Sequence, residues 1–177
     1  MSRFPLSERS RRTAFCLLAF FLSIQSGYAD ILDFSSDDTL TITADRAWEG
    51  DQADVTHFSG QFVLRAPDWS VSADTAVVYG KLDDPDRIVV EGKPANISFL
   101  RNAEDADVTD DSSERVDGTA AVLEYFRATD KLVMRGAARL TRKDSTLVSE
   151  VIEYDANTDR YSASGEGGIN IEFTPED

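Results

Sequence analysis

The sequence predicts an all-β fold, a sandwich or open β-jelly roll made of repeated, bent antiparallel hairpins. Three observations predict it. Apolar residues alternate with polar ones along most of the chain, which is typical of strands with one buried face. Short segments rich in Asp, Asn, Gly and Pro separate these runs, as turns do. A unit of two strands, the second of which runs into a Gly, recurs four times.

Residues 1–29 have the features of a secretory signal peptide. Four arginines precede the apolar run Ala14–Ile24, and small residues at Gly27 and Ala29 follow it at the spacing that signal peptidase requires. The apolar run has eleven residues, whereas a helix that spans a membrane needs about 20. We therefore expect cleavage after Ala29 and export of residues 30–177 as one domain. An uncleaved signal would instead anchor the chain in the membrane.

Five runs place their apolar residues on one face and are expected to be half-buried antiparallel strands. They are TLTITA at 39–44, FSGQFVLRA at 58–66, ANISF at 95–99, KLVMRGAARL at 131–140 and GGINIEF at 167–173. Turns are expected at EGDQAD, LDDPDR, RATDK, TRKDS and DANTDR. The polar and acidic stretch from Arg101 to Gly118 is expected to be a mobile loop between two halves of one sheet system.

Four glycines, Gly60, Gly92, Gly136 and Gly165, hold equivalent places in the repeated unit. A Gly inside a strand usually marks a bulge or a sharp bend. We therefore expect each hairpin to bend at its Gly, and stacked bent hairpins enclose a continuous apolar interior. A function that belongs to such a repeat resides in a surface or cavity built by the whole sheet, because a catalytic motif normally occurs once.

The composition argues against several classes of function. The chain has 18 basic and 33 acidic residues and a net charge of −15, so no nucleic-acid partner is expected, because phosphate binding needs a basic face. The only cysteine, Cys16, lies in the predicted signal peptide, which leaves neither disulfides nor thiolate chemistry. The only histidine, His57, is expected to be an ordinary strand residue beside a turn. We expect no catalytic residue, metal or cofactor, and no enzymatic activity.

Three stretches carry a resemblance to a known family. TADRA at 43–47, GKPANISF at 92–99 and the block VDGTAAVLEYF…LVMRGAARL at 116–140 resemble the OstA-like domain of periplasmic lipopolysaccharide-transport proteins, in particular their soluble bridge component. The resemblance covers about residues 40–173. It implies an open β-jelly roll in the periplasm that holds lipid A acyl chains inside its sandwich and passes lipopolysaccharide from the inner to the outer membrane. The strongly acidic body departs from the family.

The resemblance implies lipid contact for six interior-facing residues, and the alternation adds five that would line the same cavity. The first six are Leu40, Ile42, Ile97, Phe99, Leu123 and Tyr125, and the other five are Phe58, Phe62, Leu64, Met134 and Leu140. Any one of them would look the same as a plain core residue, so the prediction concerns the group. Arg101 and Glu124 are expected to face outward and to serve as controls.

Two runs near the ends of the chain are expected to be uncovered sheet edges, because no predicted helix flanks them. The first comprises Thr39, Leu40, Thr41, Ile42 and Thr43, and the second Ile169, Asn170, Ile171, Glu172 and Phe173. Unpaired backbone groups at such edges can accept a strand from another chain. We expect head-to-tail association of copies of this chain, and pairing with the inner-membrane-anchored and outer-membrane transport components whose domains are related to it.

Two other interpretations stay open. One is structural: a membrane-anchored relative of the bridge component, or a β-rich periplasmic adaptor that binds only protein. The other is a polysaccharide-active enzyme, for which the chain has many carboxylates but no pair set apart in a cleft. Separately, the acidic residues between 101 and 118 could bind Ca²⁺, although they lack the spacing of a calcium loop and a solvated loop is favoured. These residues are Glu104, Asp105, Asp107, Asp110 and Asp111.

Overall fold

A computed structural model describes residues 31–34, 39–102, 113–143 and 145–173, which form an antiparallel sheet of ten strands. The strands are β1 (Thr41–Thr43), β2 (Arg46–Glu49), β3 (Val55–Arg65), β4 (Trp69–Lys81), β5 (Asp84–Asn102), β6 (Ser113–Phe126), β7 (Lys131–Arg142), β8 (Ser145–Asp155), β9 (Arg160–Ser164) and β10 (Asn170–Phe173). A short 3-10 helix, η1 (Arg127–Thr129), connects β6 to β7. The predicted all-β fold is confirmed, and the predicted signal peptide lies outside the described residues.

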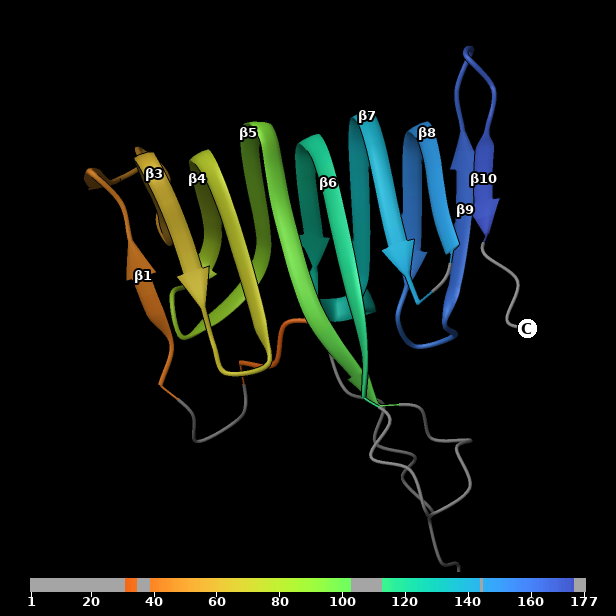
Figure 1. The fold of residues 1–177 in the computed structure, drawn as a ribbon. Coiled ribbons are helices and arrows are strands. Elements are labelled where there is room, and N and C mark those ends of the chain that lie inside the picture. Colours follow the sequence, from red (N-terminus) through yellow and green to blue (C-terminus); the bar gives the residue numbers. More distant parts are fainter. Residues whose placement is uncertain (1–30, 35–38, 103–112, 144, 174–177) are drawn as a thin grey trace, which may run out of the picture.

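The sheet folds over on itself into two layers, because each long strand passes through both. Strand β1 pairs with Val63–Arg65 of β3 and β2 pairs with Thr56–Ser59 of the same strand, so one layer begins with β1 and the other with β2. At the other end, β10 and β9 pair with successive halves of β8. Figure 1 shows the strands folding over along one side of the molecule and the two layers separating toward the opposite, open side. This is the predicted open β-jelly roll.

A line of register shifts crosses the sheet where it folds, and we call this line the crease. The shifts fall between Ser59 and Phe62 in β3, Ser72 and Thr75 in β4, Glu91 and Ala95 in β5, Thr119 and Val122 in β6, and Arg135 and Ala138 in β7. Irregularities of this kind bend a strand and increase its twist. The crease therefore gives each strand its two halves.

The repeated glycines lie on this crease, as the sequence predicts. Gly60 and Gly136 have φ of +77° and +81°, a left-handed conformation that favours glycine. Gly92 lies in the shift of β5, which also contains the cis peptide bond Lys93-Pro94. Gly165 follows the end of β9, where the chain crosses toward the other layer, and a Cβ atom on it would lie 2.5 Å from that of Glu150.

The predicted loop from Arg101 to Gly118 is corrected by the structure. Strand β5 continues to Asn102 and β6 begins at Ser113, and the two strands pair with each other directly. Polar side chains hide this part of the strand pattern, because Arg101 and Glu114 are paired partners of opposite charge. Val116, which lies between Glu114 and Gly118 in β6, is fully buried. The acidic residues 104–111, the candidate calcium ligands, lie outside the described residues.

One apolar core fills the space between the two layers. It contains side chains from β3 to β8 together with Ile31 and Leu32, and Leu40, Ile42 and Ala44 pack against its edge. Residues 31–34 lie at the open side of the jelly roll, near the turn that joins β6 to β7 (Figure 1). There the backbone N–H of Ile31 donates to Asp130 at 3.0 Å, and the indole N–H of Trp69 donates to the carbonyl of Asp33 at 3.3 Å. In the part of the chain that the structure covers, no helix is long and apolar enough to span a membrane.

Candidate lipid-binding interior and sheet edges

The structure brings all eleven predicted lipid-contacting residues into the interior between the layers. Nine are buried, with exposed fractions of 6% or less: Phe58, Phe62, Leu64, Ile97, Phe99, Leu123, Tyr125, Met134 and Leu140. The other two, Leu40 and Ile42, are half-buried and pack against the core at the β1 edge. All eleven side chains therefore belong to the interior or to its edge, and their contact with lipid stays a prediction.

The interior is closed in this structure, because side chains of the two layers meet. The rings of Phe58 and Phe62 lie 5.3 Å apart, and those of Phe99 and Tyr154 lie 5.9 Å apart. Phe62, Met134 and Tyr154 have no exposed area. A lipid chain can enter such an interior only if the layers separate or if it enters along a sheet edge.

Arg101 does not face outward, contrary to the expectation from the sequence. It belongs to the same face of β5 as Ile97 and Phe99, and its guanidinium pairs with Asp159 in the turn between β8 and β9. We call the group formed by Arg101, Glu114, Arg142 and Asp159 the charged cluster. Arg142 donates to the buried Glu114 through Nε and Nη2, at 3.4 and 3.3 Å. Simple alternation from Ile97 through Phe99 would have identified the orientation of Arg101.

The other control residue, Glu124, does lie on the outer face, where it pairs with Arg87 at 3.0 Å and with Arg135 at 2.6 Å. Its neighbour Tyr125 points into the core, and the Tyr125 hydroxyl donates to Asp130 at 3.0 Å. Adjacent residues of β6 thus face opposite sides of the layer, as period-two alternation requires.

Arg142 of the charged cluster and the Tyr154 hydroxyl beside it have shifted pKa values. Burial lowers the pKa of Arg142, but hydrogen bonds and charge interactions with Glu114 and Asp159 outweigh it and raise the pKa overall. Burial and then the negative charge of Asp159 raise the pKa of the Tyr154 hydroxyl far above its usual value. Arg142 therefore stays a cation, and Tyr154 stays a neutral hydrogen-bond donor to Asp159.

The two predicted edge runs overlap β1 and β10, at the two ends of one layer of the sheet, although Thr39, Leu40 and Ile169 lie just outside these strands. The predicted half-burial of the last run is wrong, because Ile169, Ile171 and Phe173 are 53%, 52% and 72% exposed. Ile171 is paired with the buried Leu147, so it belongs to the interior face of its layer, but no described strand lies beyond β10 to cover it. The sheet therefore ends in an exposed apolar margin.

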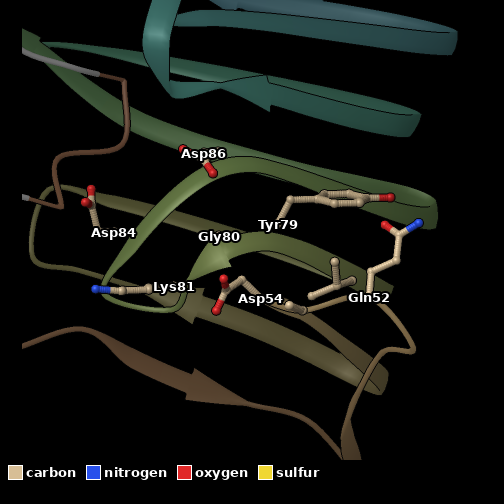
Figure 2. Close-up of a pocket in the computed structure, with 9 residues that line it drawn as sticks. Gln52, Asp54, Tyr79, Gly80, Lys81, Asp84 and Asp86 are labelled. Atoms are coloured by element: carbon tan, nitrogen blue, oxygen red, sulfur yellow. The ribbon is translucent and has the colours of Figure 1, made fainter.

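A polar pocket of about 470 Å³ lies outside this interior, between the β2–β3 and β4–β5 connections. Figure 2 shows Asp54, Asp84, Asp86 and Lys81 spread around it, with the Tyr79 ring at one side. Asp84 is already paired with Arg127. Within the described ranges, no group of three or more His, Cys, Asp or Glu side chains is arranged to hold a metal ion. The pocket therefore offers a polar surface without a defined reactive group.

His57 and the two tryptophans take structural positions. His57 lies in β3 as predicted, and its ring stacks on that of Trp48 in β2 at 5.3 Å. Trp69 is buried at the start of β4, and its ring lies 5.2 Å from that of Phe34.

A folded-over antiparallel sheet with an apolar interior and free edge strands defines the open β-jelly-roll class. The family described as "LptA/(LptD N-terminal domain) LPS transport protein" matches residues 41–160. The chain belongs to this family, as the resemblance of its sequence motifs predicts.

A solved structure gives the same fold. The chain is similar to LptH, described as the LptA-homologous periplasmic component of the conserved lipopolysaccharide transport device from Pseudomonas aeruginosa, with a TM-score of 0.64 and 18% identity. The match covers 77% of this chain and 96% of LptH. A search of curated proteins gave no significant match.

Proposed function

We propose that this chain is a periplasmic lipopolysaccharide-transport protein. In this proposal residues 1–29 are removed as a signal peptide, and the remaining domain shields lipid A acyl chains between its two layers. Its edges then link it to related domains at the inner and outer membranes. One observation carries the proposal: the apolar interior, lined by all eleven predicted residues, continues to an exposed apolar margin at Ile171 and Phe173.

The energetics of acyl burial support a carrier that also releases its cargo. Each buried methylene contributes about 0.8 kcal/mol, so one chain of about a dozen carbons contributes on the order of 10 kcal/mol. This exceeds the repulsion from the acidic surface, because surface charges are screened over about 8 Å. The chains leave a membrane in which they are already buried, however. The net free energy of transfer is therefore small, which suits a conduit.

Site-specific photo-crosslinking to lipopolysaccharide tests the proposal. Crosslinkers at Ile97 and Tyr125, which face the interior, should label lipid strongly, and crosslinkers at the outward-facing Asn96 and Glu124 should label it weakly. Each pair lies on adjacent positions of one strand, so local stability is matched. Equal labelling from both faces would contradict the cavity assignment. Mass spectrometry of lipid that copurifies with the protein would identify the bound species.

A second candidate is a β-rich adaptor that binds only protein, either exported or membrane-anchored. The observation that favours it is the closed interior, in which Phe62, Met134 and Tyr154 already have no exposed area. Absence of copurifying lipid and of crosslinks from Ile97, together with binding of partner domains, would select the adaptor. A mature N-terminus at Asp30 would exclude its anchored form.

A further inference from the structure

The charged cluster lies at the open side of the jelly roll and joins its two layers. Arg101, Glu114 and Arg142 belong to the layer that contains β1 and β10, whereas Asp159 lies in the turn that joins β8 to β9 in the other layer. Figure 1 places this turn at the open side. The sequence pattern does not bring these four residues together.

Several donors converge on the carboxylate of Asp159. Arg142 binds it with two nitrogens, Nη1 at 3.0 Å from Oδ1 and Nη2 at 3.2 Å from Oδ2. The Tyr154 hydroxyl donates to Oδ1 at 2.9 Å, and Arg101 pairs with Oδ2. Two guanidinium groups and one hydroxyl around a single anion form an arrangement that suits phosphate as well as carboxylate.

The burial of the four side chains separates a fixed part from a displaceable part. The side chain of Glu114 is 6% exposed, that of Arg142 17% and that of Arg101 26%, whereas that of Asp159 is 37% exposed. Glu114 thus holds Arg142 from the inner side, at the distances given above. Asp159 lies in a surface turn, and its displacement from the arginines would also release the hydroxyl of the buried Tyr154 as a donor for another anion. Without Asp159, two cations face one buried carboxylate, and the cluster carries a net positive charge.

The cluster also borders the apolar interior. The Arg142 guanidinium lies 6.0 Å from the centre of the Tyr154 ring, and that ring packs on Phe99. An amphiphile with acyl chains beside Phe99 would therefore bring its headgroup to Arg142. In a chain with a net charge of −15, a local cationic site of this kind counteracts the general repulsion of an anionic lipid.

We propose that Arg101 and Arg142 form a binding site for a phosphate on the headgroup of an acylated lipid, and that Asp159 occupies this site when no lipid is bound. The inference rests on the proposed function, because it requires lipid chains in the interior. Asp159 acts as an internal competitor, so that headgroup binding and release of the β8–β9 turn are coupled.

Lipid binding by the full exported chain tests the proposal, with two probes that differ only in phosphate: bisphosphorylated lipid A and the same lipid A without its phosphates. Arg142→Gln and Arg101→Gln should weaken binding of the phosphorylated lipid about tenfold, the effect of losing one charge-assisted hydrogen bond. Asp159→Asn should strengthen it, because the competing charge is removed. Binding of the dephosphorylated lipid should not change in any of the three.

Arg139→Gln is the matched control, because it removes an exposed positive charge from the same strand as Arg142. If Arg142→Gln weakens binding of both lipids equally, or if Asp159→Asn weakens binding of the phosphorylated lipid, the site is structural and the proposal is wrong. Asp159→Asn alters an exposed turn and keeps the test valid if the arginine variants fold poorly.

Two further outcomes separate this proposal from others. Saturable binding of inorganic phosphate alone, lost in Arg142→Gln, would assign the site to a soluble phosphate and overturn the lipid assignment. Failure of the unaltered chain to bind either lipid would overturn the proposed function itself. Binding of both lipids with equal affinity by the unaltered chain would leave the proposed function in place and overturn only the phosphate site.

Discussion

Gly118 of β6 and Ile97 of β5 are paired residues in neighbouring strands, and the absence of a side chain at Gly118 gives Ile97 its space. A Cβ atom on Gly118 would lie 2.8 Å from Cγ2 of Ile97 and 3.0 Å from Sδ of Met134. Both neighbours belong to the interior proposed to hold lipid. The packing at this position is therefore tight enough to be tested by substitution.

Gly118→Val should lower the free energy of unfolding by about 1–3 kcal/mol, the usual result of overpacking a core. Gly118→Ala combined with Ile97→Ala should cost less than the two single changes added together, because the second change makes room for the first. Urea unfolding measures these values. Gly167→Ala, where a Cβ would meet no atom within 4 Å, is the control. Strict additivity would show that the two residues do not compete for space.

The crease gives a second prediction. Gly136 has a φ of +81°, and a Cβ atom on it would lie 2.8 Å from that of Ala121. Gly136→Ala should therefore destabilise the protein by about 1–2 kcal/mol, through backbone strain and the close contact. The neighbouring Ala137 already has a φ of +51°, so Ala137→Gly should not destabilise. Thermal unfolding compares the two, and an equal loss at both positions would argue against a special role for Gly136.

From the raised pKa of the Tyr154 hydroxyl we expect the protein to lose stability at alkaline pH. In an unfolded chain tyrosine titrates at about pH 10, whereas burial and then Asp159 raise the pKa of Tyr154 in the folded protein. Above about pH 10 the folded state binds more protons than the unfolded state, so the free energy of unfolding falls as pH rises. This contribution is fully present below about pH 10 and is lost as pH approaches the folded pKa.

Tyr154→Phe removes this titration, so unfolding between about pH 8 and about pH 11 should depend less steeply on pH in the variant. Its stability at neutral pH should be lower, because the hydrogen bond to Asp159 is lost. The same change at the exposed Tyr161 serves as the control. Identical slopes for Tyr154→Phe and the unaltered protein would contradict the raised pKa.

The exposed margin of β10 predicts association of copies through the sheet edges. Ile171→Asp should reduce the increase in scattered light with protein concentration, which reports association of copies. It should not lower the free energy of unfolding, because this residue is 52% exposed. Truncation before Gly167 should abolish the increase in scattered light, since it removes the edge that would pair with β1 of the next copy. Glu172→Gln, on the other face of β10, is the control. An increase that persists in both altered chains would show that association uses another surface.

The sequence predicts the strands well wherever alternation is regular, as in ANISF and KLVMRGAARL, because one face of each is buried against the opposite layer. It fails between Arg101 and Gly118, where a charged pair and a Gly replace the apolar residues of two strand ends. Charge pairing between strands depends on which residues face each other, and a local pattern does not contain that information.

The edge run near the C-terminal end illustrates the opposite failure. Its alternation of Ile169, Ile171 and Phe173 is the pattern of a half-buried strand, yet all three are exposed. The pattern reports which face would be buried, and the position of β10 at the end of the sheet decides whether a neighbour exists to bury it. The sequence pattern does not predict the charged cluster for a related reason, since Asp159 comes close to the arginines only because the sheet folds over.

The strand order also determines how the chain can fold. Every pairing joins strands that are neighbours, or next but one, along the chain, and the crease lets one hairpin contribute to both layers at once. Structure can therefore form from a central hairpin such as β5–β6 and add one strand at a time, without closing a long loop. Opening follows the reverse order, from the terminal strands inward. Amide hydrogens of β1 and β10 should accordingly exchange with solvent long before those of β5 and β6.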